Sequence, residues 1–85
     1  MFNSIWCRII LNERNTFSRR NGIEFRYHVS KNKVIVEGEN HALSKEDFLK
    51  VYNLMKELTF SEIESMVVGT KYIWPILNDK RIKEY

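Results

Sequence analysis

Residues that commonly catalyse reactions or bind metals are sparse in this chain of 85 residues. His28 and His41 are its histidines and Cys7 is its cysteine, so the sequence cannot assemble a zinc site of the usual spacing or an internal disulfide. Cys7 lies between Trp6 and an aliphatic stretch, a setting that favours a buried apolar role over that of a nucleophile. These residues therefore predict neither metal nor thiol chemistry.

Carboxylates and glycines do not supply a catalytic centre either. Glu37 and Glu39 stand close together, but no third acid or supporting lysine nearby completes the site of a metal-dependent nuclease. The three glycines are dispersed, so the chain has no glycine-rich phosphate loop. We therefore expect no enzymatic activity and no cofactor.

The distribution of charge is the first indication of a binding function. Residues 1–43 contain seven Lys or Arg and four Asp or Glu, which gives +3, whereas residues 44–85 contain seven of each. The basic excess of the chain, whose pI is near 9.1, thus lies in the half that we expect to be rich in strands. Such an excess is typical of nucleic-acid-binding proteins, although many other proteins share it.

Turn signals predict an antiparallel meander that would position these basic residues. Asn21-Gly22 is the preferred pair for a two-residue type I′ hairpin, because both turn residues need a positive φ. Strands are therefore expected at 16–20 and 23–30. A second tight turn at Lys31-Asn32 leads into a strand at 33–37.

Pairing across these turns divides the predicted sheet into two faces. The core face carries Phe25, Tyr27, Val29, Val34 and Val36. The other face carries Phe17, Arg19, Glu24, Arg26, His28 and Glu37, with Arg19 opposite Glu24 and Phe17 opposite Arg26. One interpretation is a solvated face whose opposite charges neutralise one another. The other is a platform on which Phe17 and His28 stack on bases while arginines pair with phosphates.

Candidate binding residues combine this platform with basic residues near strand ends and turns, which would contact phosphates. Lys71 joins them from the helical half, as an exposed residue of the expected last helix. The set is Arg14, Phe17, Arg19, Arg20, Arg26, His28, Lys31, Lys33 and Lys71.

After Gly38 the apolar period changes from two to about three and a half, the spacing of helices. The segment Ser44-Lys45-Glu46-Asp47 resembles a capping box and opens a helix. One apolar stripe of that helix contains Phe48, Val51, Tyr52 and Met55. Near the N-terminus, the apolar run at 5–11 is compatible with either a fourth strand or a short helix.

The C-terminal part predicts a helical hairpin. Thr59 to Glu62 is a second cap signal, and Gly69 is expected to end that short helix in a left-handed conformation. A last helix should begin near Thr70 or Tyr72, with Pro75 in its first turn. The rhythm resembles a helix-turn-helix, but Pro75 falls where such a motif needs an uninterrupted recognition helix.

A combination of short motifs runs through this half of the chain. It consists of a Glu46-Asp47-Phe48 helix start, Gly69, Tyr72-Ile73-Trp74 and Ile76-Leu77-Asn78-Asp79-Lys80-Arg81-Ile82. The combination resembles a pattern found in small modules attached to bacterial restriction-type nucleases, would span residues 16–82, and contains no catalytic signature. The resemblance implies a non-catalytic role in contacting DNA.

The expected fold is α+β in one domain over residues 1–85. It consists of a three-stranded antiparallel meander, with a fourth strand left open, followed by a helix and a short helical hairpin. The N-terminus lacks the features of a signal peptide, and its longest aliphatic run is far shorter than the roughly 20 residues of a membrane span. We therefore expect a cytoplasmic protein without a membrane partner.

Two functions remain open at this level. The first is a small nucleic-acid-binding accessory or regulatory module, with DNA as the expected ligand. The second is a protein-interaction module, such as a phage- or defence-related inhibitor or a dimerising subunit domain. Trp6, Tyr72, Trp74 and Tyr85 are candidates for its interface, because interfaces are enriched in Trp, Tyr and Arg. A continuous stripe of free arginines favours nucleic acid, whereas scattered and salt-bridged arginines favour protein.

Overall fold

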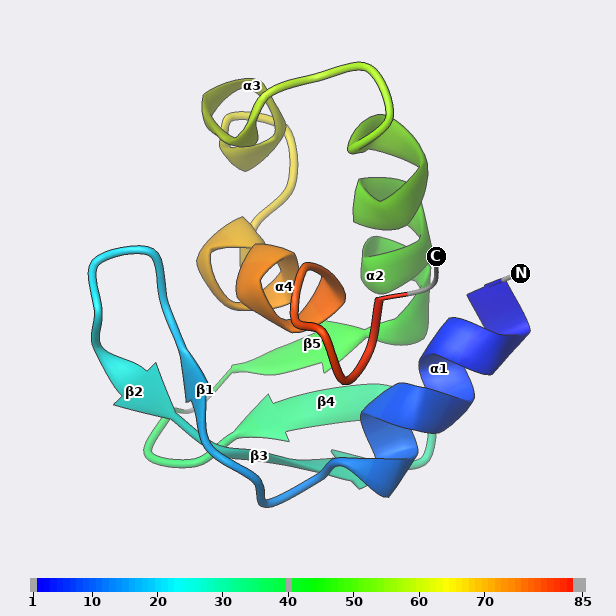
Figure 1. Ribbon diagram of the computed structural model, residues 1–85, viewed down its shortest axis with the longest axis vertical. Coiled ribbons are helices and arrows are strands. Elements are labelled where there is room, and N and C mark those ends of the chain that lie inside the picture. Colours follow the sequence, from blue (N-terminus) through cyan, green and yellow to red (C-terminus); the bar gives the residue numbers. More distant parts are fainter. Residues whose placement is uncertain (1, 40, 84–85) are drawn as a thin grey trace.

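The structure, a computed structural model, describes residues 2–39 and 41–83. Strands β3, β4 and β5 form a three-stranded antiparallel sheet, and β1 and β2 form a separate two-stranded hairpin. Helices α2, α3 and α4 gather on one side of the larger sheet, and the hairpin stands beside α4 (Figure 1). The predicted α+β class is confirmed. In chain order the elements are α1 (Phe2–Leu11), β1 (Phe17–Ser18), β2 (Glu24–Phe25), β3 (Tyr27–Ser30), β4 (Lys33–Val36), β5 (Ala42–Ser44), α2 (Lys45–Leu54), α3 (Phe60–Glu64) and α4 (Thr70–Leu77).

The apolar run at 5–11 is part of α1, which decides between the strand and the helix left open above. Ile5, Trp6 and Ile9 recur at helical spacing and are buried. The same spacing turns Cys7 outward, and its side chain is exposed. The expectation of a buried Cys7 is therefore wrong, because the run is amphipathic and not apolar all round.

The turn of the β1–β2 hairpin is one residue longer than Asn21-Gly22 predicts. The Gly22 N–H donates to the Arg19 carbonyl at 2.9 Å, and the Arg19 N–H donates to the Ile23 carbonyl at 2.8 Å. The loop is therefore Arg20-Asn21-Gly22, with Gly22 at a φ of 88°. This is the arrangement of a type I turn followed by a left-handed glycine.

The longer turn changes which side chains face each other. Phe17 pairs with Phe25 and not with Arg26, and Glu24 pairs with Ser18 and not with Arg19. A slip of one residue moves a side chain to the opposite face of a sheet. Phe17 is accordingly 2% exposed and belongs to the core, so its predicted place on an outer stacking platform is wrong.

The larger sheet follows the second predicted turn. Lys31-Asn32 joins β3 to β4, with His28 opposite Ile35 as expected. The strand expected at 23–30 is broken at Arg26, because its first part pairs with β1 and its second part with β4. Strand β5 pairs with β4 and was not predicted, since three residues are too short to show an alternating pattern.

Helix caps agree with the sequence signals. The Ser44 hydroxyl accepts from the Asp47 N–H at 3.1 Å, and Thr59 and Glu62 form a reciprocal capping box. Gly69 is left-handed as predicted, with a φ of 90°, but it immediately precedes α4 instead of ending α3. Packing also requires glycine at this position, because a Cβ at Gly69 would clash with the Leu43 side chain.

Pro75 lies inside α4 and not in its first turn, which corrects the expected position. The helix begins at Thr70 and continues to Leu77 despite the proline. Ile73, Ile76 and Leu77 are buried, and this packing, more than intrinsic propensity, holds a short helix together.

One hydrophobic core joins the strands to the helices. Of the predicted core face, Val29 is half-buried and the remaining residues are buried. The Tyr27 hydroxyl donates to the Ile9 carbonyl at 2.6 Å, and burial raises the pKa of Tyr27, so it stays protonated and ties β3 to α1. Buried residues of the helical half include Phe48, Val51, Ile63, Ile73, Ile76 and Leu77.

Within the described ranges, no helix is both long and apolar enough to cross a bilayer.

Candidate functional site

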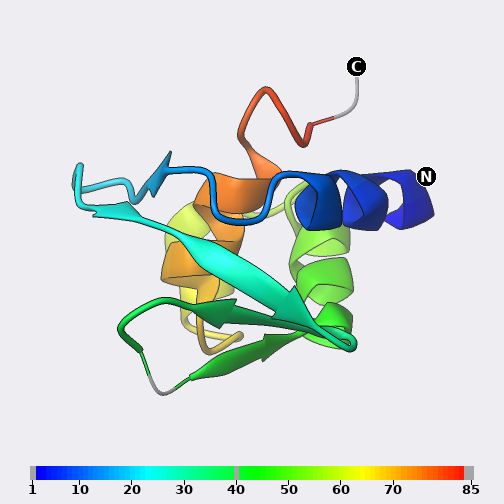
Figure 2. The same cartoon turned by 90° about the horizontal axis from the view of Figure 1, so that it is seen from below.

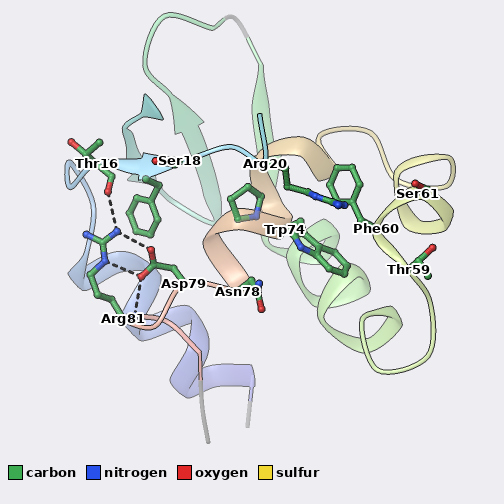
Figure 3. Close-up of a pocket in the computed structure, with 12 residues that line it drawn as sticks. Thr16, Ser18, Arg20, Thr59, Phe60, Ser61, Trp74, Asn78, Asp79 and Arg81 are labelled. Atoms are coloured by element: carbon green, nitrogen blue, oxygen red, sulfur yellow. Dashed lines mark hydrogen bonds and ion pairs between the residues drawn. The ribbon is translucent and has the colours of Figure 1, made fainter. Parts of the chain in front are cut away.

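An open cleft of about 780 Å³ separates the β1–β2 hairpin from the start of α3 and the end of α4 (Figure 3). We call it the hairpin cleft. Its volume is in the range of small-ligand sites, about 300–1,000 Å³. It is lined by Thr16, Phe17, Ser18, Arg20, Thr59, Phe60, Ser61, Trp74, Pro75, Asn78, Asp79 and Arg81.

One end of the cleft is an arginine placed over aromatic rings. The Arg20 guanidinium carbon lies 4.2 Å from the centre of the Phe60 ring, within the range of a cation–π contact. The rings of Phe60 and Trp74 meet edge to face at 5.5 Å and 87°. Arg20 is exposed, whereas both rings are half-buried. The outward face of the guanidinium therefore remains open to a planar ligand.

The other end contains Arg81, which forms an ion pair with Asp79 and fastens the C-terminal segment to the hairpin through Thr16 and Phe17. The Arg81 Nε lies 2.9 Å from the Asp79 Oδ1, and the Arg81 Nη2 donates to the Thr16 carbonyl at 2.9 Å. The Arg81 guanidinium also covers the Phe17 ring at 4.2 Å. Hydrogen bonds from Arg81 hold the pKa of Asp79 below its ordinary value, and Asp79 raises that of Arg81. Asp79 and Arg81 lie beyond the end of α4 at Leu77, so they belong to the C-terminal segment and not to the helix.

Polar groups lie between the two ends. Asn78 is exposed, and its Oδ1 accepts from the Lys83 Nζ at 3.4 Å. Figure 3 shows Asn78 between the Arg81 end and the Trp74 end, with hydroxyls of Thr16 and Ser18 on one side and of Thr59 and Ser61 on the other. The cleft thus combines aromatic side chains with hydrogen-bonding groups.

Predicted basic residues continue from both ends of the cleft. Arg19, Arg20 and Lys71 line a neighbouring hollow of about 160 Å³, which shares Arg20 and Phe60 with the cleft. At the Arg81 end, the Arg26 Nε donates to the Thr16 hydroxyl at 3.3 Å. We call the resulting row the basic track: Lys71, Arg19, Arg20, Arg81 and Arg26.

Most of the basic track is not neutralised by acids. Within residues 2–39 and 41–83, neither Arg19, Arg20 nor Arg26 forms an ion pair, although Glu24 and Glu64 line adjoining hollows. The Arg19 Nε is buried and has no hydrogen-bond partner in this part of the chain. The cross-strand pairs of the solvated-face interpretation are therefore absent from the described residues. A buried donor without a partner is costly, which makes Arg19 a natural contact for an acceptor group.

Other predicted site residues lie away from the cleft. His28 is half-buried on β3, and Lys31 and Lys33 lie at the turn between β3 and β4. Figures 1 and 2 show this turn at the opposite end of the molecule from the hairpin tip. Arg14 is exposed before β1 at a φ of 69° and lines none of the hollows described above. The structure thus does not bring Arg14, His28, Lys31 and Lys33 together with the basic track.

Sequence reasoning missed half of the cleft. The sequence places Phe60 in a helix-cap signal and offers Trp74 only as an interface candidate, and it gives Asn78 no separate role. Their proximity to Arg20 depends on how α3 and α4 pack beside the hairpin. The bond from Arg81 to Thr16 joins distant parts of the chain, for which no local pattern exists.

No protein-family model, curated protein or solved structure matches this chain. The resemblance to modules of restriction-type nucleases thus stays a prediction. Among the described residues, no three His, Cys, Asp or Glu side chains are grouped so that they could hold a metal ion. The geometry of the cleft and of the basic track is therefore the basis for a functional proposal.

Proposed function

We propose that this protein is a small non-catalytic module that binds nucleic acid, with DNA as the expected ligand. The observation that supports it best is the basic track, which flanks an aromatic cleft and carries three arginines that form no ion pair within residues 2–39 and 41–83. Nucleic-acid interfaces combine these two features, because cations neutralise phosphates and aromatic rings take bases.

The track would contact the phosphate backbone. Arg20, Arg26 and Lys71 are exposed, so they can reach a polyanion without rearrangement of the core. Arg19 is half-buried over the Tyr72 ring, 5.5 Å from its centre, and would present a pre-oriented guanidinium. Preorganised arginines lose less side-chain entropy on binding than free ones.

The role that follows is an accessory or regulatory one in a cytoplasmic setting. The module would add affinity for nucleic acid, and chemistry would be left to another protein. The proposed role needs no cofactor and no membrane partner.

Fluorescence anisotropy with labelled duplex and single-stranded oligonucleotides tests the proposal. We expect micromolar or tighter binding at about 50 mM salt and a steep loss of affinity at about 200 mM, as phosphate contacts require. Arg19→Ala and Arg26→Ala should each weaken binding, whereas Lys50→Ala, which removes a charge from the exposed side of α2, should not. Absence of binding at the lower salt concentration would rule the proposal out.

A protein partner is the second candidate, and one surface favours it. Val68 is 75% exposed and Met66 is 53% exposed on the segment between α3 and α4. Exposed apolar side chains of this size mark interaction sites when they gather. A Val68→Ser variant removes the apolar side chain without adding a charge beside Lys71, which lines the same hollow. It should abolish capture of such a partner, or concentration-dependent self-association, and leave oligonucleotide binding unchanged.

A further inference from the structure

We propose that the hairpin cleft takes an unstacked base, so that the module prefers single-stranded nucleic acid to duplex. This inference rests on the proposed function, because it names the form of nucleic acid that the same site would bind. It concerns the cleft itself, whereas the basic track alone would serve either form.

The shape of the cleft argues for a planar ligand. Its lining includes Trp74 and Pro75 together with the Arg20 guanidinium, which is held against the Phe60 ring at 4.2 Å. A base can stack on an arginine plane as well as on an aromatic ring. A base inside a duplex is already stacked on both sides, so only an unpaired base can enter.

Hydrogen-bonding groups are placed for the edge of such a base. Asn78 is exposed between the two ends of the cleft, and an amide can donate and accept at the same time (Figure 3). Ser18 and Ser61 line the same space from opposite sides and add adaptable hydroxyls. These groups can hydrogen-bond to any of the bases and do not select one base type. The cleft should therefore distinguish single strands from duplexes and not one sequence from another.

The cation at one end is placed for an adjoining phosphate. Arg20 lies at that end and forms no ion pair within residues 2–39 and 41–83, whereas Arg81 at the other end is held by Asp79 and by the Thr16 carbonyl. A base seated between them would direct its neighbouring phosphate toward Arg20, while the fixed Arg81 closes the far end of the cleft. The cleft and the basic track then bind one continuous strand.

Trp74 provides a direct readout of this arrangement. It lines the cleft, whereas Trp6 is buried against Phe48 at a ring distance of 5.7 Å. A base in the cleft should therefore quench the fluorescence of Trp74 and leave that of Trp6 unchanged. A Trp74→Phe variant identifies which tryptophan responds.

The test compares three probes of equal length, about ten nucleotides, which is within the usual site size of single-strand binders. They are oligothymidylate, the same strand with every base removed, and a duplex. We expect oligothymidylate to bind roughly tenfold more tightly than the abasic strand. It should quench the tryptophan fluorescence of the wild type but not that of the Trp74→Phe variant. Oligouridylate in a further arm distinguishes RNA from DNA as the source of the strand.

Variants locate the base. Phe60→Leu keeps an apolar side chain but removes the ring under Arg20, and Asn78→Ala changes an exposed residue. Each should reduce the preference for oligothymidylate over the abasic strand by roughly threefold to tenfold. Tyr52→Leu is the matched control, because Tyr52 is a half-buried ring beside Lys56, at 5.2 Å, outside the cleft.

Each remaining outcome counts against the inference in a different way. Equal binding of the base-containing and abasic strands, or a duplex preference, would overturn base seating and leave the proposed function standing. Quenching that persists in Trp74→Phe would place the base elsewhere and also overturn it. Failure of every probe to bind would remove both the inference and the proposed function.

Discussion

The guanidinium of Arg20 lies 4.2 Å from the centre of the Phe60 ring, and this contact bridges the hairpin and the helical half. It depends on the length of one turn. A two-residue turn would have put Phe17 on the outer face, whereas the Arg20-Asn21-Gly22 loop buries Phe17 and places Arg20 at the cleft. The same local detail thus builds the core and orients a binding residue.

Replacing Arg20 separates binding from folding. Arg20→Ala should weaken oligonucleotide binding by roughly tenfold at low salt, because it removes a phosphate contact and a stacking surface. Its thermal stability should change by less than about 1 kcal/mol, since Arg20 is exposed and its contact with Phe60 is a surface cation–π pair. Anisotropy and thermal denaturation measure the two effects. A large loss of stability with unchanged affinity would show that Arg20 is structural.

Replacing Arg81 should lower the free energy of unfolding more than replacing the adjacent Lys80. Arg81→Ala removes the bond to the Thr16 carbonyl and the cover over Phe17, so we expect a loss of about 1–2 kcal/mol. Lys80→Ala is the control, because Lys80 is exposed and adjacent in sequence. Urea denaturation compares the two. Equal stabilities would contradict the role of Arg81 as a fastening between the C-terminal segment and the hairpin.

The Asp79–Arg81 pair predicts a defined pH dependence. Arg81 lowers the pKa of Asp79 in the folded state, so the unfolded chain binds a proton more readily. The contribution of Asp79 to stability is therefore complete above its ordinary pKa of 3.8 and is lost as the pH falls through the lower folded value. Asp79→Asn should be less stable than the wild type at pH 7, and the gap should narrow toward pH 2. Denaturation curves at several pH values measure it, and a constant gap would refute the pairing.

Two glycines with the same backbone conformation distinguish strain from packing. Gly38 and Gly69 have φ values of 86° and 90°, but only at Gly69 would a Cβ meet another side chain, that of Leu43. Gly38→Ala should cost about 1 kcal/mol for the left-handed conformation. Gly69→Ala should cost about 1–3 kcal/mol more, because the added methyl overpacks the core. Similar losses in the two variants would mean that Leu43 moves aside freely.

Local signals predicted the parts of the fold that depend on neighbouring residues. The caps at Ser44 and Thr59 and the turn at Lys31-Asn32 lie where the sequence indicated, since each is decided within a few residues. The hairpin turn shows the limit of such signals. Asn21-Gly22 favours two turn types, and burial of Phe17 against Phe25 selects the longer one.

The candidate site was less accessible to sequence reasoning than the fold. Arg19 and Arg26 were expected to bind as parts of a sheet face, and Arg20 as a residue of the turn. Arg20 instead lines the cleft beside α3 and α4, and Arg19 and Arg26 line hollows that adjoin it. No local sequence pattern indicates that Arg20 and Phe60 are in contact, because tertiary packing brings them together. Pro75 shows the same effect, since packing of α4 tolerates it where propensity alone would end the helix.

The salt dependence of oligonucleotide affinity, measured for the wild type and for the Arg19→Ala/Arg20→Ala double variant, tests the central claim most directly. If the basic track binds phosphates, log Kd should rise linearly with log salt in the wild type. The slope should fall by about two in the double variant, one for each lost phosphate contact. A wild-type affinity that is independent of salt, or a slope that the double substitution leaves unchanged, would contradict the assignment of this surface to nucleic acid.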